Sequence, residues 1–174
     1  MVDIAQLQTV SYIAGALGVC VAAFYYVMTL RSQQSSMKTN IETRQAQLFM
    51  STFQSTYSKE WQRAQRKVYK LQLTEVSDFD KIDEDEDLSE AFYIIASYFE
   101  GIGVLVKENL IDIRLVSELI SGVILRWWAK FGPGVIKCRE AWGFPRYCVE
   151  IEYLAERVTE YGREHPELGI LRRL

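Results

Sequence analysis

The first thirty residues hold the longest apolar stretch of the chain. Ile4 to Leu30 contains no charged side chain, and the section from Val10 to Leu30 is apolar almost throughout. A helix of about 20 apolar residues is long enough to cross the hydrocarbon core of a bilayer. A secretory signal peptide begins with a basic segment, whereas only Asp3 is charged before this stretch. The pattern therefore predicts a transmembrane anchor over residues 1–30.

The predicted span has two unlike faces. Bulky side chains such as Leu17, Val21 and Phe24 recur on one face, and small or polar side chains recur on the other. The second face, called here the small-residue seam, comprises Ser11, Ala14, Gly15, Gly18, Ala22, Tyr25 and Thr29. Small residues let helix backbones approach closely in lipid, so we expect the seam to mediate self-association. The alternative is that the seam lines the channel of an oligomeric membrane pore.

After Leu30 the pattern changes to that of amphipathic helices. Residues 31–45 form a polar juxtamembrane neck without Gly or Pro, so the predicted span can continue as one helix. Apolar side chains then recur at helical spacing over 46–57 and 58–71. The segment 88–107 is apolar on nearly every side, which is typical of a central helix. These segments predict a helical domain after the neck.

The C-terminal half is expected to contain three further helices. Asp112 is a favourable N-cap for the first, and Gly132-Pro133-Gly134 is expected to end it. A short helix over 134–142 and an amphipathic helix from Arg146 to Glu164 follow, and the tail should be loosely held. We therefore predict an all-α protein, with one N-terminal transmembrane helix followed by a cytosolic helical bundle. Its parts are the anchor at 1–30, the neck at 31–45, the cytosolic helical domain at 46–164 and the tail at 165–174.

The net charge of −3 conceals an uneven distribution. Arg31 to Lys70 carries eight basic and two acidic side chains, whereas Glu75 to Asp112 carries two basic and twelve acidic ones. Basic residues follow the span and only Asp3 precedes it, so the positive-inside rule predicts a single-pass protein of the cell membrane with its N-terminus outside and its C-terminal domain cytoplasmic. A basic segment beside a span favours membrane lipids as partners and disfavours nucleic acid. An ordinary solvated charged surface is the alternative.

Candidate catalytic chemistry is sparse. His165 is the single histidine, and Cys20, Cys138 and Cys148 lack metal-ligand spacing, so no metal centre or disulfide framework is expected. The chain contains neither a phosphate-binding loop nor a Gly-x-Ser-x-Gly motif. An acidic stretch starts like a calcium loop, but Leu88 stands where that loop needs glycine. We therefore predict no cofactor and no enzyme activity.

Glu100 is the only acid in the apolar run "SYFEGIGVLV". A carboxylate in an apolar site needs a partner, and the later helices offer Arg114, Arg126 and Arg139. We expect Glu100 and these three arginines to act as a structural anchor. The alternative is a membrane-bound enzyme that uses buried carboxylates, with Glu100 paired to Glu150 or Glu152. Gly101 and Gly103 are not a dinucleotide fingerprint, because the third glycine of that motif would fall at Val106. They are expected to mark a close helix crossing.

Several of these motifs carry a resemblance to a known family. The run "YFEGIGVLVKENLID", a helix bearing Trp128, the arginine at Arg139 and the later "IEYLAERV" resemble an uncharacterised prokaryotic family of single-span membrane-anchored helical proteins. That family is a domain of unknown function with a Phe-Glu-Gly-Ile-Gly motif. The resemblance covers roughly Ile4 to Tyr161. It implies a membrane-anchored helical domain and supplies no activity.

The expected function is therefore that of a membrane-anchored, homo-oligomeric interaction or scaffold domain without catalysis. It would self-associate through its transmembrane helix, or serve as an accessory subunit of a larger membrane assembly. The pore and the carboxylate enzyme stand as alternatives.

Overall fold

The chain is entirely helical where the structure describes it. The computed structural model describes the backbone of residues 4–173 and the side chains of residues 11–171. Asp3, which enters the orientation prediction, and Leu174, in the predicted tail, lie outside the described residues. Within residues 4–173 there are six α-helices, three short 3-10 helices and no strand. The all-α prediction is therefore confirmed.

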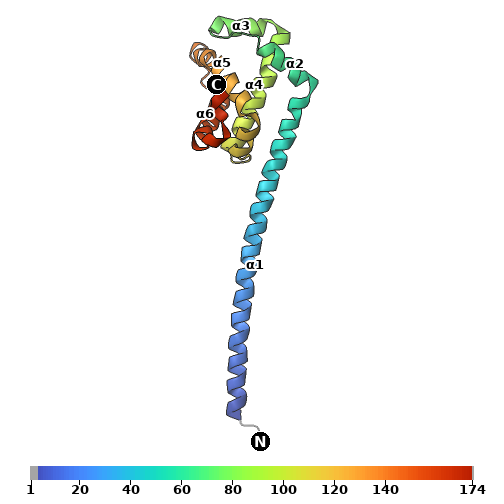
Figure 1. Ribbon diagram of the computed structural model, residues 1–174, viewed down its shortest axis with the longest axis vertical. Helices are drawn as coiled ribbons and strands as arrows, with labels where there is room; N and C mark the ends of the chain where they lie inside the picture. The colour runs from blue at the N-terminus through green and yellow to red at the C-terminus, as the bar shows by residue number, and fades with distance from the viewer. Residues whose placement is uncertain (1–3, 174) are drawn as a thin grey trace. The chain divides into compact units, whose positions relative to one another are not determined.

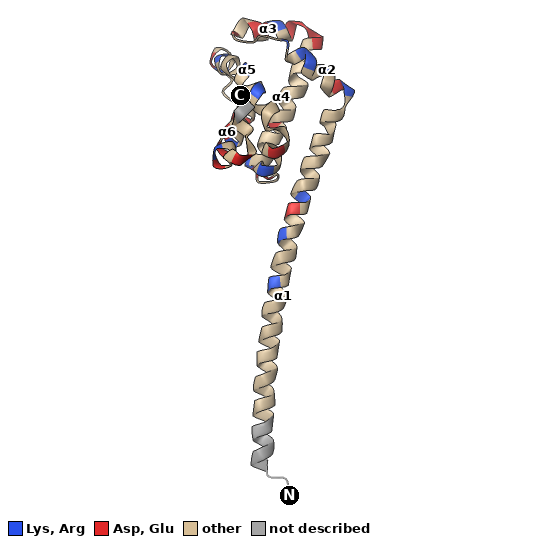
Figure 2. Cartoon of the chain, in the orientation of Figure 1, with Lys and Arg blue, Asp and Glu red and all other residues tan. Residues whose placement is uncertain are grey.

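Helix α1 (Ile4–Gln54) contains the apolar stretch, the polar neck and the first amphipathic segment in one element (Figure 1). Contacts divide the chain into two units at Arg44, so α1 belongs to both. In the first unit, the side chains of residues 11–44 are exposed except for the partly covered Thr29. Figure 2 shows the charges of the neck spaced along α1 beyond a stretch that has none.

The second unit, Gln45 to Leu174, is a helical body with its own core. The 3-10 helix η1 (Ser55–Tyr57) leads from α1 to α2 (Lys59–Val68) and α3 (Val76–Glu84). Three longer helices follow: α4 (Glu86–Lys107), α5 (Ile113–Ala141) and α6 (Val149–Glu164). Helix α4 packs against α2, α3 and α6, and α5 packs against α3 and α6 (Figure 1).

Short polar side chains cap the starts of α2, α4 and α5. Ser58 accepts a hydrogen bond from the Trp61 amide at the start of α2, and Asp85 accepts one from the Leu88 amide at the start of α4. Asp112 accepts one from the Arg114 amide at the start of α5, as its sequence position predicts. Such caps satisfy backbone donors that lack partners within the helix.

The prediction that Gly132-Pro133-Gly134 ends the helix that Asp112 caps is wrong. The helix continues through this tripeptide to Ala141, so the expected separate helix over 134–142 does not exist. Pro133 is exposed, whereas a Cβ at Gly134 would lie 2.6 Å from the Leu73 carbonyl oxygen. Gly134 therefore serves close packing, and burial on both sides of Pro133 offsets the cost of about 3 kcal/mol that an internal proline normally imposes.

The core is built around aromatic rings from α4 and α5. The fully buried Trp127 has ring centroids at 5.2 Å from Phe131, 5.8 Å from Phe92 and 6.1 Å from Phe99. Ile151, Leu154 and Val158 complete the core from α6. Rings at these separations add to the energy of area burial.

The C-terminal segment also differs from the prediction of a loosely held tail. Two 3-10 helices, η2 (Pro166–Leu168) and η3 (Ile170–Arg173), follow α6. Ile170 and Leu171 pack against the core, and a Cβ at Gly162 would lie 3.2 Å from atoms of both. Burial of these two apolar side chains accounts for the ordered path of the segment.

Candidate functional site

The Phe-Glu-Gly-Ile-Gly segment lies in the middle of α4, where α4 crosses the start of α6. Phe99 and Ile102 point into the core. Gly103 is buried at the crossing. The two helices are so close there that a Cβ on Gly103 would overlap the carbonyl group of Glu150. Gly101 has open space around it, so only Gly103 serves the close crossing that both glycines were expected to mark.

Glu100 lies one helical turn before Gly103 and faces the first turn of α6. Burial raises the pKa of the Glu100 carboxyl, while the nearby backbone amides of Ile151 and Glu150 lower it. The Glu150 carboxylate raises that pKa and the charge of Arg139 lowers it, both as smaller effects. The oxygen Oε1 of Glu100 is buried without a hydrogen-bond partner. The carboxylate therefore occupies the amide-rich end of α6, where the helix dipole favours negative charge.

No local side chain caps that end of α6. Its N-cap residue is Cys148, which has a left-handed backbone (φ 53°) and makes no capping hydrogen bond with its side chain. Left-handed conformations are uncommon outside glycine and Asn or Asp. Glu100 thus brings a carboxylate from α4 to the first turn of α6, where a capping residue would normally supply an acceptor oxygen from the adjoining chain.

Arg139 holds the turn between α5 and α6. Its guanidinium donates hydrogen bonds to the carbonyl oxygens of Tyr147 (2.7 Å) and Cys148 (3.1 Å). It also forms an ion pair with Glu152, with 2.5 Å between Nη1 and Oε2. Since this side chain is mostly buried, its charge-assisted bonds are stronger than those of an exposed pair.

Lys107 completes the cluster from the end of α4. Its Nζ lies 2.9 and 3.1 Å from the two carboxylate oxygens of Glu150. The acids Glu150 and Glu152, which sequence analysis considered as catalytic partners of Glu100, are therefore each engaged by a cation. Sequence analysis did not single out Lys107. Its position seven residues after Glu100, which places both side chains on one side of a helix, could have indicated it.

The predicted anchor residues are only partly brought together. Arg139 lies at the same junction as Glu100, and its ion pair is with Glu152. Arg114 is exposed, with 3.9 Å between its Nε and Oδ2 of Asp112. Arg126 is exposed and donates from Nε to the Gly122 carbonyl at 2.8 Å. Of the three arginines, Arg139 is therefore the one that pairs with the acidic first turn of α6.

The cysteines near this junction are poorly suited to nucleophilic chemistry. Burial raises the pKa of Cys148 to about 12 and that of Cys138 to about 11. A thiol must lose its proton to act as a nucleophile or metal ligand. Among the residues that the structure describes, no group of three His, Cys, Asp or Glu side chains is placed to hold a metal ion. The junction is thus arranged as a polar joint between α4, α5 and α6.

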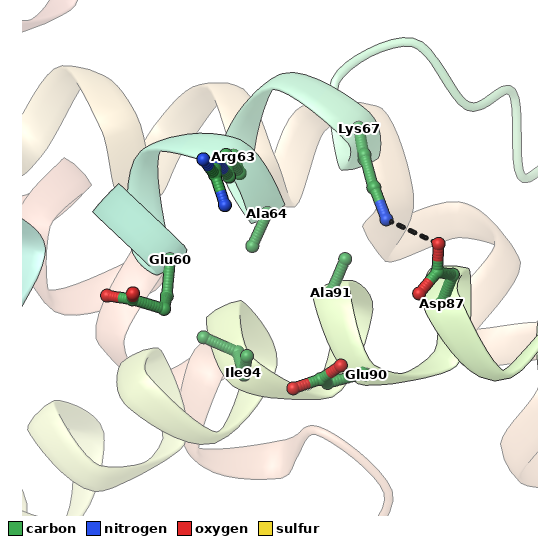
Figure 3. Close-up of a pocket in the computed structure, with 8 residues that line it drawn as sticks. All are labelled: Glu60, Arg63, Ala64, Lys67, Asp87, Glu90, Ala91 and Ile94. Carbon is green, nitrogen blue, oxygen red and sulfur yellow. Dashed lines mark hydrogen bonds and ion pairs between the residues drawn. The ribbon is translucent and has the colours of Figure 1, made fainter. Parts of the chain in front are cut away.

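A second polar site is a small groove between α2 and α4 (Figure 3). Ala64 and Ala91 face each other across it and let the two helices approach. Lys67 of α2 pairs with Asp87 of α4 at 3.1 Å. The remaining charged side chains around the groove are Glu60, Arg63 and Glu90. Its volume of about 170 Å³ is below the range of about 300–1,000 Å³ typical of ligand pockets.

The small-residue seam lies on the exposed surface of α1. Its members are exposed apart from Thr29, which donates a hydrogen bond to the Tyr25 carbonyl at 2.9 Å. Among the described residues, a Cβ at Gly15 or Gly18 would meet no atom within 4 Å outside its chain neighbours and the backbone of α1 itself. Within the described residues, two helical stretches, Ser11–Tyr57 and Glu86–Lys107, are long and apolar enough to cross a membrane by length and composition. The second is α4, a core helix of the body.

Comparison with known proteins identifies the family. The family described as "Domain of unknown function (DUF4760)" matches residues 12–158. The chain belongs to the DUF4760 family. The DUF4760 match includes most of α1 together with the body as far as Val158, so the exposed apolar helix and the α4–α6 junction both fall inside it. No curated protein and no solved structure matches the chain. The Phe-Glu-Gly-Ile-Gly segment as a family motif stays a prediction.

Proposed function

We propose that this DUF4760 protein is a single-pass membrane-anchored interaction domain that self-associates through the small-residue seam of α1. The observation that carries the proposal is the exposure of the apolar part of α1. Leu17 is 61% exposed and Phe24 is 68% exposed, in a stretch without any charge. Soluble proteins rarely leave so long an apolar surface in water, and a hydrocarbon layer would cover it.

Self-association is supported by the two glycines of the seam. Apart from neighbouring residues and the backbone of α1 itself, no atom of the described residues would lie within 4 Å of a Cβ at Gly15 or Gly18, so packing among the described residues gives no reason for a missing side chain there. Close contact with the helix of a second copy would give that reason. The body would then act as a scaffold, alone or as an accessory subunit of a larger membrane assembly.

The absence of catalysis belongs to the same proposal. Glu150 and Glu152 are held in ion pairs, and burial raises the pKa of both Cys138 and Cys148. These groups are better suited to joining helices than to proton transfer or nucleophilic attack. Arg31, Lys38 and Arg44 on the neck would contact anionic lipid headgroups.

The test is the size of the full-length protein in mild detergent, measured by light scattering after size-exclusion chromatography. We expect a homo-oligomer. Replacing Gly18 by Leu should weaken self-association by about tenfold or more, equivalent to about 1.4 kcal/mol, because the new side chain separates the backbones. Phe24→Leu on the bulky face is the matched control and should have little effect.

A monomeric wild type would contradict self-association and direct attention to a different membrane protein on the seam. An oligomer that conducts ions across reconstituted bilayers, with a current that Gly18 substitution changes, would favour the pore. Packing is proposed over the pore because Gly15, Gly18 and Ala22 offer little polar lining for ions.

The proposed orientation places the N-terminus outside and the body in the cytoplasm. The native thiols Cys138 and Cys148 are buried, so a new cysteine at the exposed Ser77 is the better reporter. A membrane-impermeant maleimide should label Ser77→Cys only after the cells are permeabilised, and should label Val2→Cys in intact cells. Labelling of Ser77→Cys in intact cells would reverse the assigned topology.

A further inference from the structure

The body has a second, larger groove on the other side of α2. It is formed by the end of α1, η1, α2, α4 and α5, and its volume is about 470 Å³. Its inner surface includes the buried side chains of Trp61, Phe99 and Ile120. Tyr57 and Leu119 line it as well and are 67% and 52% exposed. The size lies within the range typical of small-molecule sites, which are mostly apolar with a few polar groups.

The aromatic rings give this groove flat apolar surfaces. The rings of Trp61 and Tyr98 meet edge to face, with centroids 4.5 Å apart. Trp61 also meets Phe99 at 6.2 Å, and Phe53 meets Tyr57 at 5.4 Å. Rings held against one another in this way bind apolar groups with little loss of side-chain freedom, since aromatic side chains have few rotatable bonds.

The only charged side chain among the lining residues of the groove is basic. Gln62, Gln65 and Arg66 line it from α2, and no carboxylate is among its lining residues. Arg66 donates from Nε to the Gln62 carbonyl at 3.3 Å and forms no ion pair within the described part of the chain. The groove of Figure 3 differs, because its lining includes the carboxylates of Glu60, Asp87 and Glu90, and Lys67 is paired with Asp87.

We propose that this groove binds a small amphiphilic anion, with an apolar body against Tyr57, Leu119 and the accessible edge of Trp61, and its anionic group on Arg66. Arg66, which has no carboxylate partner among the described residues, favours a ligand that carries a negative charge. Guanidinium groups bind carboxylate, sulfonate or phosphate oxygens with strong charge-assisted bonds. The aromatic surface selects for an apolar body, and the volume limits the occupant to a small molecule. The side-chain amides of the exposed Gln62 and the partly buried Gln65 are additional hydrogen-bond donors near the anionic end.

The experiment uses two photoreactive probes on the full-length protein in mild detergent. The anionic probe is 4-benzoylbenzoate, and the neutral probe of equal shape is 4-benzoylbenzamide. Saturable labelling is measured as a function of probe concentration, and mass spectrometry locates the labelled residues. We expect the anionic probe to label peptides that contain Tyr57 or Leu119 and the neutral probe to require about tenfold higher concentrations, as loss of a charged hydrogen bond predicts.

Two arginines of the same helix provide matched variants. Arg66→Gln should weaken binding of the anionic probe by about tenfold and leave the neutral probe unchanged. Arg66→Lys keeps the charge and should retain part of the preference for the anion. Arg63→Gln removes a charge from the other groove and should behave as wild type. Circular dichroism of each variant verifies that the fold is kept.

Three results would overturn the proposal. Labelling confined to the apolar part of α1 would show that the probes simply partition into the detergent-covered surface. Equal binding by Arg66→Gln and Arg63→Gln would remove the role of Arg66. Labelling of the groove that does not saturate as the probe concentration rises would show that no defined site holds the probe.

Discussion

At the residue scale, two glycines separated by one position in α4 have opposite surroundings. Gly103 is pressed against the Glu150 backbone, whereas Gly101 is exposed with free space around it. Gly103→Ala should lower the free energy of unfolding by about 1–3 kcal/mol because α4 and α6 must separate. Gly101→Ala should raise it by up to about 1 kcal/mol, since alanine favours the helix.

Thermal unfolding followed by near-UV circular dichroism compares the two variants directly. For a chain of this size, each kcal/mol corresponds to a shift in Tm of about 2–4 °C. The two shifts should have opposite signs. A stabilising Gly103→Ala would mean that α4 and α6 are not in close contact at this point.

A second prediction concerns the contribution of Glu100 to the pH dependence of stability. Because burial raises the pKa of its carboxyl in the folded protein, the folded state binds the Glu100 proton more tightly than the unfolded state. The contribution of this group to stability is therefore present below the ordinary glutamate pKa and is lost as the pH rises through the raised value. Wild type should gain stability relative to Glu100→Gln when the pH is lowered from 7 toward 4.5.

Urea unfolding of both proteins across that pH range measures the difference. The comparison cancels groups that titrate alike in both proteins, although Arg139 and Glu150 act on Glu100 directly. A difference that is constant with pH would mean that Glu100 keeps an ordinary pKa. The opposite slope would mean that the α6 amides and Arg139 outweigh burial.

The sequence showed that Glu100 needs a partner but could not select one. Its charge in an apolar run was visible, and so were three candidate arginines. The actual neighbours depend on which helix end meets α4. That end belongs to α6, some fifty residues later, so no local spacing encodes the contact. Long-range helix crossings are decided by packing of the whole core.

At the scale of elements, the start signals of helices were predictable and the stop signals less so. Asp112 capped α5 as expected because an Asp side chain satisfies the first amides locally. Gly132-Pro133-Gly134 failed as a stop because Leu73 and Phe79 pack against Gly134. Tertiary contacts can hold a helix through residues that would end it in an isolated peptide.

The tail was mispredicted for a similar reason. The tail was expected to be loosely held, yet Ile170 and Leu171 pack against apolar neighbours of the core. Two apolar side chains are too few to form a helical pattern. Their burial depends on where α5 and α6 leave space, which the sequence does not reveal.

At the scale of the whole molecule, the core is confined to the second unit. Every buried apolar side chain from Phe49 to Val158 lies in that unit, and the side chains of residues 11–44 contribute none. A fragment of residues 45–174 should therefore fold alone and unfold cooperatively. We expect its Tm to lie within about 2–4 °C of the full-length value, which is the shift that corresponds to about 1 kcal/mol.

Circular dichroism and size-exclusion chromatography of the fragment check this prediction. If α1 residues before 45 only anchor and associate, the fragment should be a monomer. A fragment without a cooperative transition would mean that the first unit contributes to the stability of the body. A fragment that forms oligomers would place an association surface on the body.

The placement of the Glu100 carboxylate beside the first turn of α6 has a consequence for the order of folding. Helices α2, α4 and α5 carry their caps in the adjoining sequence, so their first turns can form early and independently. The first turn of α6 receives the charge of Glu100 only after α4 has arrived, and Arg139 must bring the preceding turn into place. Formation of that turn is therefore coupled to closure of a loop of some fifty residues, which is entropically costly. In native-state hydrogen exchange, the amides of Glu150 and Ile151 should open together with the α4–α6 contact, and in refolding they should gain protection late.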